Sequence, residues 1–360
     1  MKELHSFGWY AKQITPKLPE KAFKPVPARL LGGLAYLSIT VAGILVIGLI
    51  DSFYWWLSLI MAAVIGLSFA GMGFLGHEIL HGTVVRKPWL RDFLGGVAFY
   101  PLSVGPKLWR KWHNATHHAH TQHVEKDPDA WPTLEKFTQD DNKFQWVYKL
   151  PWFIRSIISF AFLGISFTMH SLNMFKLFIK EFKPSNRPIV WIQMILPWAT
   201  WLGLLFWLGP VKWVFAILIP LAIANTVVMS YIATNHRLNP ITNVNDPLAN
   251  SLSVTVPKWI DVLHFNFSYH TEHHLFPGMS PKYYPMVKKH IMEMWPERYH
   301  AMPHWKALMA LWKTPRLYYN EKQFIDPAQG NVYNTLGNGL DPSNIEYMKK
   351  HDIKGEQESL

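Results

Sequence analysis

Residues 52–81 read SFYWWLSLIMAAVIGLSFAGMGFLGHEILH, a stretch without charge up to Gly76 that ends in two histidines four residues apart. A membrane-spanning helix needs about 20 apolar residues, because the hydrocarbon core is roughly 30 Å thick and a helix rises about 1.5 Å per residue. Residues 52–76 meet that length, and His77 and His81 share one helix face just beyond them. The stretch therefore predicts a helix that crosses a membrane and presents two imidazoles at its end.

Three other uncharged stretches have the length of a span: 30–50, 189–211 and 213–235. Short connections at Asp51 and at residues 209–212 join the four spans into two hairpins. We expect a fifth apolar stretch, 156–175, to lie in or dip into the interface, because it follows Arg155, carries His170, and as a fifth span would separate the histidines. The predicted fold is an all-α integral membrane protein with four transmembrane helices in two hairpins and a cytoplasmic, histidine-rich helical cap.

Composition and charge agree with a membrane protein. Of the 360 residues, 49% are hydrophobic and 16% are charged, and the net charge of +11 fits anionic lipid or an acidic protein partner better than nucleic acid. Basic residues flank the long polar regions, whereas the hairpin turns hold only Lys212. By the positive-inside rule, both termini and the histidines face the cytoplasm, and we expect the plasma membrane of a bacterium.

These observations divide the chain into six segments. They are a cytoplasmic N-terminal segment 1–29, transmembrane hairpin 30–76, a cytoplasmic cap 77–188 with interfacial helices, transmembrane hairpin 189–235, a second part of the cap 236–325, and a solvated tail 326–360.

The 18 histidines are concentrated in three clusters, and the chain has no cysteine. Residues three or four apart lie on one helix face, so each cluster aims several imidazoles in one direction. Neutral imidazole binds iron, zinc and copper, and eight such ligands exceed what one ion uses, so two metal ions are expected. The clustered histidines are His77 and His81, then His113, His117 and His118, then His270, His273 and His274.

Other interpretations of the motifs remain. The sequence from His77 to His81 also fits H-E-x-x-H, the pattern of zinc proteases, although such an enzyme needs only one further ligand. Residues 71–76 spell G-x-G-x-x-G, but they close an apolar helix, so close helix packing is favoured over dinucleotide binding. On a regular helix His118 points roughly 140° away from His113, whereas His120 points almost the same way as His113.

The order and spacing of the three clusters and the paired hairpins resemble the membrane fatty acid desaturase family over residues 30–280. Residues 125–129 and 275–277 are similar to what acyl-lipid desaturases carry. The resemblance implies a di-iron enzyme that uses O2 and two external electrons to introduce a cis double bond into an acyl chain. The electrons would come from a ferredoxin, flavodoxin or cytochrome, and the substrate would be a fatty acyl lipid among the membrane lipids.

The resemblance also implies particular ligands. His236 matches a ninth histidine of the family, and the family pattern selects His118, through a π-bulge, with His120 in reserve. Some members add a water-linked asparagine. Its position here is Ile232, which leaves Asn235 or Asn266 for that role, or no asparagine at all.

Further residues are expected to support the centre. Four carboxylates could hydrogen-bond the ligands, and a basic run beside the second cluster could dock the electron donor or bind lipid phosphate. A hydroxylase or related oxygenase on the same scaffold is the main alternative to a desaturase, and an intramembrane zinc protease is the lesser one. The supporting residues are the carboxylates Glu78, Glu272, Asp127 and Asp129 and the basic residues Lys107, Arg110 and Lys111.

Overall fold

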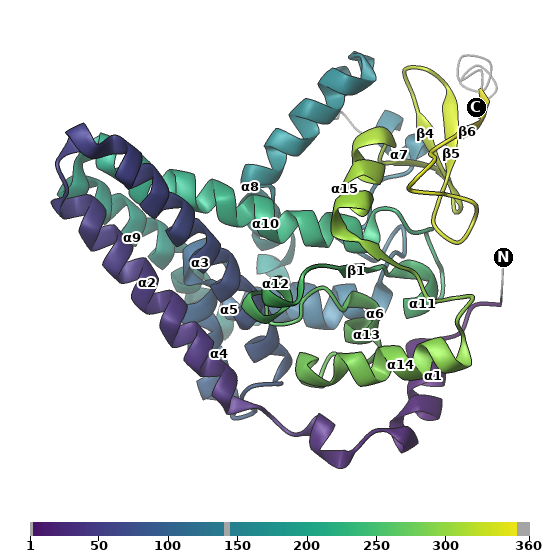
Figure 1. The fold of residues 1–360 in the computed structure, drawn as a ribbon, viewed down its shortest axis with the longest axis horizontal. Helices are drawn as coiled ribbons and strands as arrows, with labels where there is room; N and C mark the ends of the chain where they lie inside the picture. Colours follow the sequence, from purple (N-terminus) through teal and green to yellow (C-terminus); the bar gives the residue numbers. More distant parts are fainter. Residues whose placement is uncertain (1–2, 140–144, 351–360) are drawn as a thin grey trace.

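The computed structural model describes residues 3–139 and 145–350 (Figure 1). Most of the described chain is helical, and short 3-10 turns connect the helices. The α-helices are α1 Phe7–Ile14, α2 Leu30–Leu49, α3 Trp55–His81, α4 Pro88–Phe99, α5 Pro106–Trp109, α6 His118–His120, α7 Leu134–Gln139, α8 Trp152–Phe178, α9 Arg187–Trp213, α10 Ile219–His236, α11 Pro247–Asn250, α12 Lys258–Leu263, α13 His270–Leu275, α14 Tyr284–Met294 and α15 His304–Lys313. Two π-helices cover Arg110–His117 and Val214–Leu218.

Four helical stretches are long and apolar enough to cross a membrane: Pro27–Leu49, Ser52–His81, Trp152–Glu181 and Pro184–His236. The stretch Pro184–His236 contains both α9 and α10. Its helical geometry is interrupted within α9 at Gly209, where φ is 72°. The expected spans 30–50 and 52–76 fall on α2 and α3, and 189–211 and 213–235 fall on α9 and the run that ends as α10. Figure 1 shows α2, α3 and α9 side by side.

The apolar stretch 156–175 belongs to α8, a helix of 27 residues. This helix is long and apolar enough to cross a membrane, although the sequence led us to expect a segment that lies in or dips into the interface. It packs against α10 and extends away from the group of α2, α3 and α9 (Figure 1). Its interfacial position stays a prediction.

The glycines of residues 71–76 are sites of close helix contact. A Cβ atom on Gly71 would lie 2.4 Å from the Tyr36 ring of α2, and one on Gly73 would lie 2.6 Å from Leu102. A Cβ atom at Gly71 would collide with the Tyr36 ring, and one at Gly73 would displace the end of the Leu102 side chain, so these glycines allow α3 to lie close to its neighbours. The packing interpretation is therefore confirmed, and the motif is not a loop after a strand.

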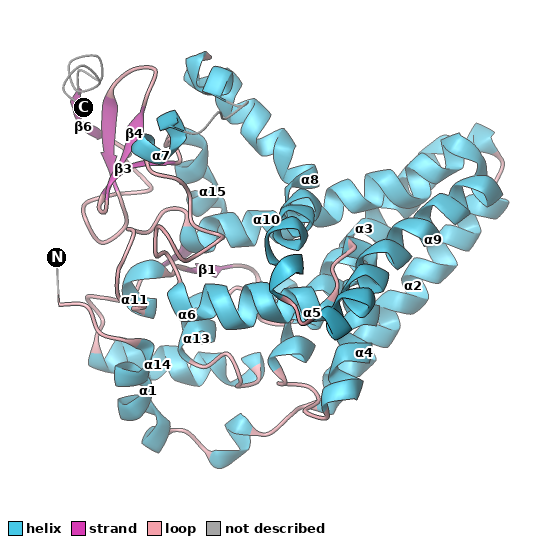
Figure 2. Cartoon of the chain, turned by 180° about the vertical axis from the view of Figure 1, so that it is seen from behind, coloured by secondary structure: helices cyan, strands magenta, loops and turns pink. Residues whose placement is uncertain are grey.

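The C-terminal part differs from the expected all-α fold. Strands β3 Leu317–Asn320, β4 Gln323–Asp326, β5 Asn331–Asn334 and β6 Tyr347–Lys350 form an antiparallel sheet in the order β3-β4-β5-β6 (Figure 2). A second, parallel pair joins β1 Ser253–Thr255 to β2 Ala301–Pro303. Val332 and Thr335 are fully buried, so the predicted solvated tail begins with strands that pack against the protein, whereas residues 337–350 are exposed or half-buried. The strands are only four residues long and are separated by polar turns, so no strand pattern stands out in the sequence. Residues 351–360 lie outside the described part.

A buried ion pair ties this sheet to α8. The Arg155 guanidinium donates two hydrogen bonds, of 2.9 and 2.6 Å, to the Asp326 carboxylate, and their side chains are 8% and 2% exposed. Removing one partner of a buried pair leaves the other charge without compensation, which costs about 3–5 kcal/mol.

We predict that Asp326→Ala lowers the unfolding temperature of the detergent-purified protein by several degrees, because Arg155 loses its only ion-pair partner in the described chain. The double variant Arg155→Met, Asp326→Leu should recover much of the loss, since neither charge remains buried. Glu20→Ala, which removes an exposed pair with Lys24, is the control and should change little. Equal unfolding temperatures for Asp326→Ala and Glu20→Ala would contradict the prediction. Intrinsic tryptophan fluorescence during heating provides the measurement.

Candidate metal centre

Four segments that are distant in sequence bring the clustered histidines together. The C-terminal end of α3, the π-helix Arg110–His117 with α6, the last residue of α10, and α13 all meet at one place, at the inner ends of α3 and α10 (Figure 1). The histidines that they contribute are His77, His81, His113, His117, His118, His236, His270, His273 and His274.

Five of these histidines form a first group, whose candidate ligand nitrogens all lie within 4.8 Å of one another. The Nε2 atoms of His77 and His113 are 3.1 Å apart, and those of His118 and His273 are 3.0 Å apart. The remaining member is His81, whose Nε2 is buried without a hydrogen-bond partner. The group is composed of His77, His81, His113, His118 and His273.

The other four histidines form a second group beside the first. Ligand nitrogens of His117, His236 and His274 lie within 4.8 Å of one another. His270 completes the group, because its Nε2 is 2.7 Å from Nε2 of His236 and 3.1 Å from Nε2 of His274. Two groups of this kind match the expected number of two ions.

The π-helix determines which histidine of the second cluster joins the first group. The His118 N–H donates to the His113 carbonyl, five residues earlier, as in π-helical hydrogen bonding. The wider turn aligns residues five apart, and the two Nε2 atoms lie 3.2 Å from each other. His120 belongs to neither group.

The contacts among the nitrogens fit a cation better than hydrogen bonds. The Nδ1–H of His236 donates to the Asn250 carbonyl at 3.0 Å, so in the neutral ring Nε2 carries only a lone pair. Burial also lowers the pKa values of His270, His273 and His274 well below 6.5, which keeps these rings neutral. Lone pairs that face each other at about 3 Å repel unless a positive ion lies between them. The residues therefore fit a nitrogen-ligated metal.

His117 behaves differently from the other rings. Its Nδ1 lies 2.9 Å from Asp127 Oδ1. Burial lowers the pKa of His117, but the Asp127 carboxylate outweighs burial and raises it to about 9. Without a metal this ring carries a proton that a bound cation would displace, and Asp127 would then orient the ring.

Asp129 connects the cluster to α8. Its Oδ1 accepts a hydrogen bond from Trp112 Nε1 at 2.8 Å and lies 2.6 Å from Nε2 of His170, and its Oδ2 is 3.4 Å from Nδ1 of His117. The sequence analysis did not assign a role to His170. The one feature of the sequence that could have indicated a role for His170 is its position as a histidine within an otherwise apolar stretch.

The glutamates expected near the ligands have other partners among the described residues. Glu78 is buried and its Oε1 accepts a hydrogen bond from Arg29 at 2.5 Å, whereas its Oε2 has no hydrogen-bond partner among the described residues. Glu272 accepts hydrogen bonds from Tyr299 and Ser253 at 2.5 and 2.6 Å. Both carboxylates brace the helices that carry the histidines.

The basic run beside the second cluster is partly neutralised within the chain. Arg110 pairs with Asp92 at 2.9 Å and Lys111 pairs with Glu181 at 2.8 Å. Lys107 has no ion pair among the described residues. Two of the three charges are thus already compensated, which weakens this run as a dock for an acidic donor.

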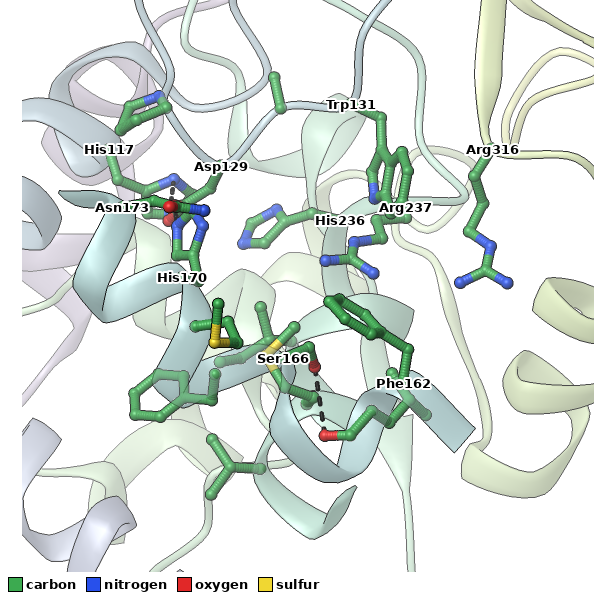
Figure 3. A pocket seen from close by; sticks show the side chains of 18 of the residues that line it. His117, Asp129, Trp131, Phe162, Ser166, His170, Asn173, His236, Arg237 and Arg316 are labelled. Atoms are coloured by element: carbon green, nitrogen blue, oxygen red, sulfur yellow. Dashed lines mark hydrogen bonds and ion pairs between the residues drawn. The ribbon is translucent and has the colours of Figure 1, made fainter. Parts of the chain in front are cut away.

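A cavity of about 460 Å³ leads from the histidines into the protein (Figure 3). Its walls are mainly apolar side chains of α8 and α10, among them Phe162, Phe167 and Val228. His117, Asp129 and His170 lie at one side in Figure 3, and Trp131, Arg237 and Arg316 lie at the other, with His236 between them. The mainly apolar lining suits an apolar chain that lies beside the candidate metal centre. The histidines that line it are His77, His113, His117, His170, His236 and His270.

Comparison with known proteins agrees with this geometry. The sequence model of the family "Fatty acid desaturase" matches residues 54–306. The chain is 24% identical to an sn-1 oleoyl-lipid 12-desaturase of Picosynechococcus over 76% of this chain and 81% of that protein. It is 23% identical to the protein of the same name from Synechocystis over 91% of both chains. An sn-1 acyl-lipid omega-3 desaturase (ferredoxin) from Synechocystis is 27% identical over 41% of this chain and 40% of its own length. The match over most of the chain shows that it belongs to the fatty acid desaturase family and is an oxidoreductase.

Proposed function

We propose that the chain is a membrane di-iron desaturase that introduces a cis double bond into the acyl chain of a lipid. The observation that carries the proposal is the convergence of nine histidines in two groups beside an apolar cavity. The first group would hold one iron and the second the other. Bound iron would reduce O2 with two external electrons and so supply the oxidant for removing two hydrogens from unactivated carbons.

The protein's own task is to position the substrate and exclude water. Phe74, Phe162 and Met229 line the cavity between the histidines and the α8 side, so an acyl chain would replace water along the wall. Asp127 and Asp129 would hold His117 in orientation through Nδ1. Asn235 is fully buried with both amide atoms unpartnered, which favours it over Asn266 as a further polar group near the centre.

Substrate and donor follow from the relatives. Two relatives are named for action on oleoyl lipids, which supports an acyl-lipid substrate. One is named with ferredoxin, which favours a ferredoxin among the three donor classes. The positive-inside pattern supports a cytoplasmic site, with both termini cytoplasmic and both hairpin turns outside.

We predict about two iron ions per chain in protein purified from iron-supplied cells, because two separate groups of imidazoles are present. Elemental analysis by mass spectrometry checks this. Active protein that contains one zinc ion and no iron would contradict the proposal.

A second prediction concerns single ligands. His81→Ala, His117→Ala or His273→Ala should reduce double-bond formation at least about 100-fold, because each change opens a coordination position while the membrane helices remain. Lipid mass spectrometry in a host that lacks unsaturated chains measures the product, and membrane fractionation verifies insertion. His290→Ala is the matched control, since His290 contacts Glu293 far from either group, and it should retain most activity. Full activity in the three ligand variants would rule out the assignment.

A third prediction separates His118 from His120. His118→Ala should lose activity and iron, because its Nε2 lies between those of His113 and His273, whereas His120→Ala should keep both. His236→Ala should resemble His118→Ala, since its Nε2 contacts those of His270 and His274. The same lipid and metal measurements apply. Loss in His120→Ala with an active His118→Ala protein would mean that the π-helix does not place the ligand.

A further inference from the structure

Two arginines face the cavity at the side away from Asp129 (Figure 3). Arg237 directly follows His236 at the end of α10, and Arg316 precedes β3. Arg316 is 8% exposed and Arg237 is half-buried. A fixed positive charge in such a place costs free energy unless an anion or a hydrogen-bond acceptor compensates it.

Neither guanidinium has an ion pair or a side-chain hydrogen bond in the described part of the chain, and Asp129 attracts Arg237 without pairing with it. Both guanidinium groups lie over aromatic rings: Arg237 lies 4.5 Å from the centre of Trp131, and Arg316 lies 5.7 Å from the same ring and 6.0 Å from Phe160. A cation–π contact stabilises a buried positive charge less than a hydrogen-bonded carboxylate does. The two arginines therefore share one aromatic neighbour, and neither is paired with a carboxylate among the described residues.

The nearby carboxylates are engaged elsewhere. Asp326 receives both hydrogen bonds of Arg155, and Asp129 is held by Trp112 and His170. Other buried arginines in this chain do have acidic partners, as Arg298 has in Asp246 at 2.7 Å. The missing partner at Arg237 and Arg316 is thus a local feature of the cavity.

A third donor points to the same kind of ligand. The Trp131 Nε1 is buried and has no hydrogen-bond partner in the described structure. One indole N–H and two guanidinium groups together match the several acceptor oxygens of a phosphate or carboxylate. The apolar cavity continues from this point to the histidines, so a molecule with an anionic group at one end and an apolar chain at the other would match it.

We propose that Arg237, Arg316 and Trp131 form a binding site for the anionic head of the acyl lipid, a phosphate in the first instance. The proposal deepens the proposed function, on which its assignment to a substrate rests. The site would hold the head while the acyl chain runs past His236 toward the metal centre. It would favour anionic phospholipids over neutral lipids that have the same chains.

Binding to the His273→Ala protein, which we expect to be inactive, tests this apart from catalysis. The full-length protein in nonionic detergent is loaded with a pyrene-labelled phosphatidylglycerol, which is then displaced by dioleoylphosphatidylglycerol or by dioleoylglycerol, which lacks the phosphate. We expect the phospholipid to displace the probe about ten-fold more strongly. Arg237→Gln and Arg316→Gln, each in that background, should bring the ratio close to one.

Two further variants keep the result interpretable. Arg316→Lys retains the charge and should keep part of the preference even if a glutamine variant unfolds. Lys313→Gln removes an exposed charge three residues away, outside the cavity, and should not alter the ratio. Equal displacement by both lipids in the His273→Ala protein, or a preference that persists in both glutamine variants, would overturn the site.

Oleate and inorganic phosphate identify the source of the anion. Displacement by inorganic phosphate alone would support the anion site with free phosphate as its ligand, and displacement by oleate as strong as by the phospholipid would support a carboxylate. A lipid preference that depends on the arginines, in a chain whose wild type forms no double bonds, would leave the anion site standing and refute the desaturase proposal. Double-bond formation by a protein that shows no preference for the phospholipid would refute the anion site and leave the desaturase proposal standing.

Discussion

Nitrogens of buried imidazoles face one another at 2.7–3.2 Å, and the surrounding structure serves to hold them there. Such contacts repel without a cation, so each ring needs an anchor on its other side. Asp127, the Asn250 carbonyl and the Tyr284 hydroxyl provide anchors at Nδ1 for three rings. The helices that carry the rings are braced in turn, α3 by Glu78 with Arg29 and α13 by Glu272.

Much of this arrangement could be predicted because it depends on local spacing. Imidazoles three or four residues apart on a helix must share a face, so the clusters were visible in the sequence. Spans of about 20 uncharged residues were equally visible, and their order placed all clusters at one end. The helix that carries His77 and His81 is also the more buried of the first two. In the most apolar segment of α3, 67% of the residues are buried, against 17% in α2, so α2 lies on the outside of the helix group.

Other features depend on contacts that no local pattern records. The helical angle alone favoured His120, and only the π-helix, a departure from regular geometry, brings His118 to His113. The partner of Asp129 is His170, 41 residues later. The sheet after residue 317 was missed because its strands are short and its turns are rich in glycine and asparagine, residues that also mark solvated tails. Its Asp326 pairs with Arg155, which lies 171 residues earlier in the chain.

Charge placement links these features to the choice of substrate. In a protein surrounded by hydrocarbon, a buried cation is retained only where something compensates it. Arg29, Arg155 and Arg298 have carboxylates, and each of these pairs fixes one segment to another. Arg237 and Arg316 fix nothing within the described chain, and replacing them by apolar residues would enlarge the hydrophobic wall without a loss of internal contacts other than those to aromatic rings. Charges that the fold itself does not use are best explained by a ligand, and the cavity that they border is the one that reaches the histidines.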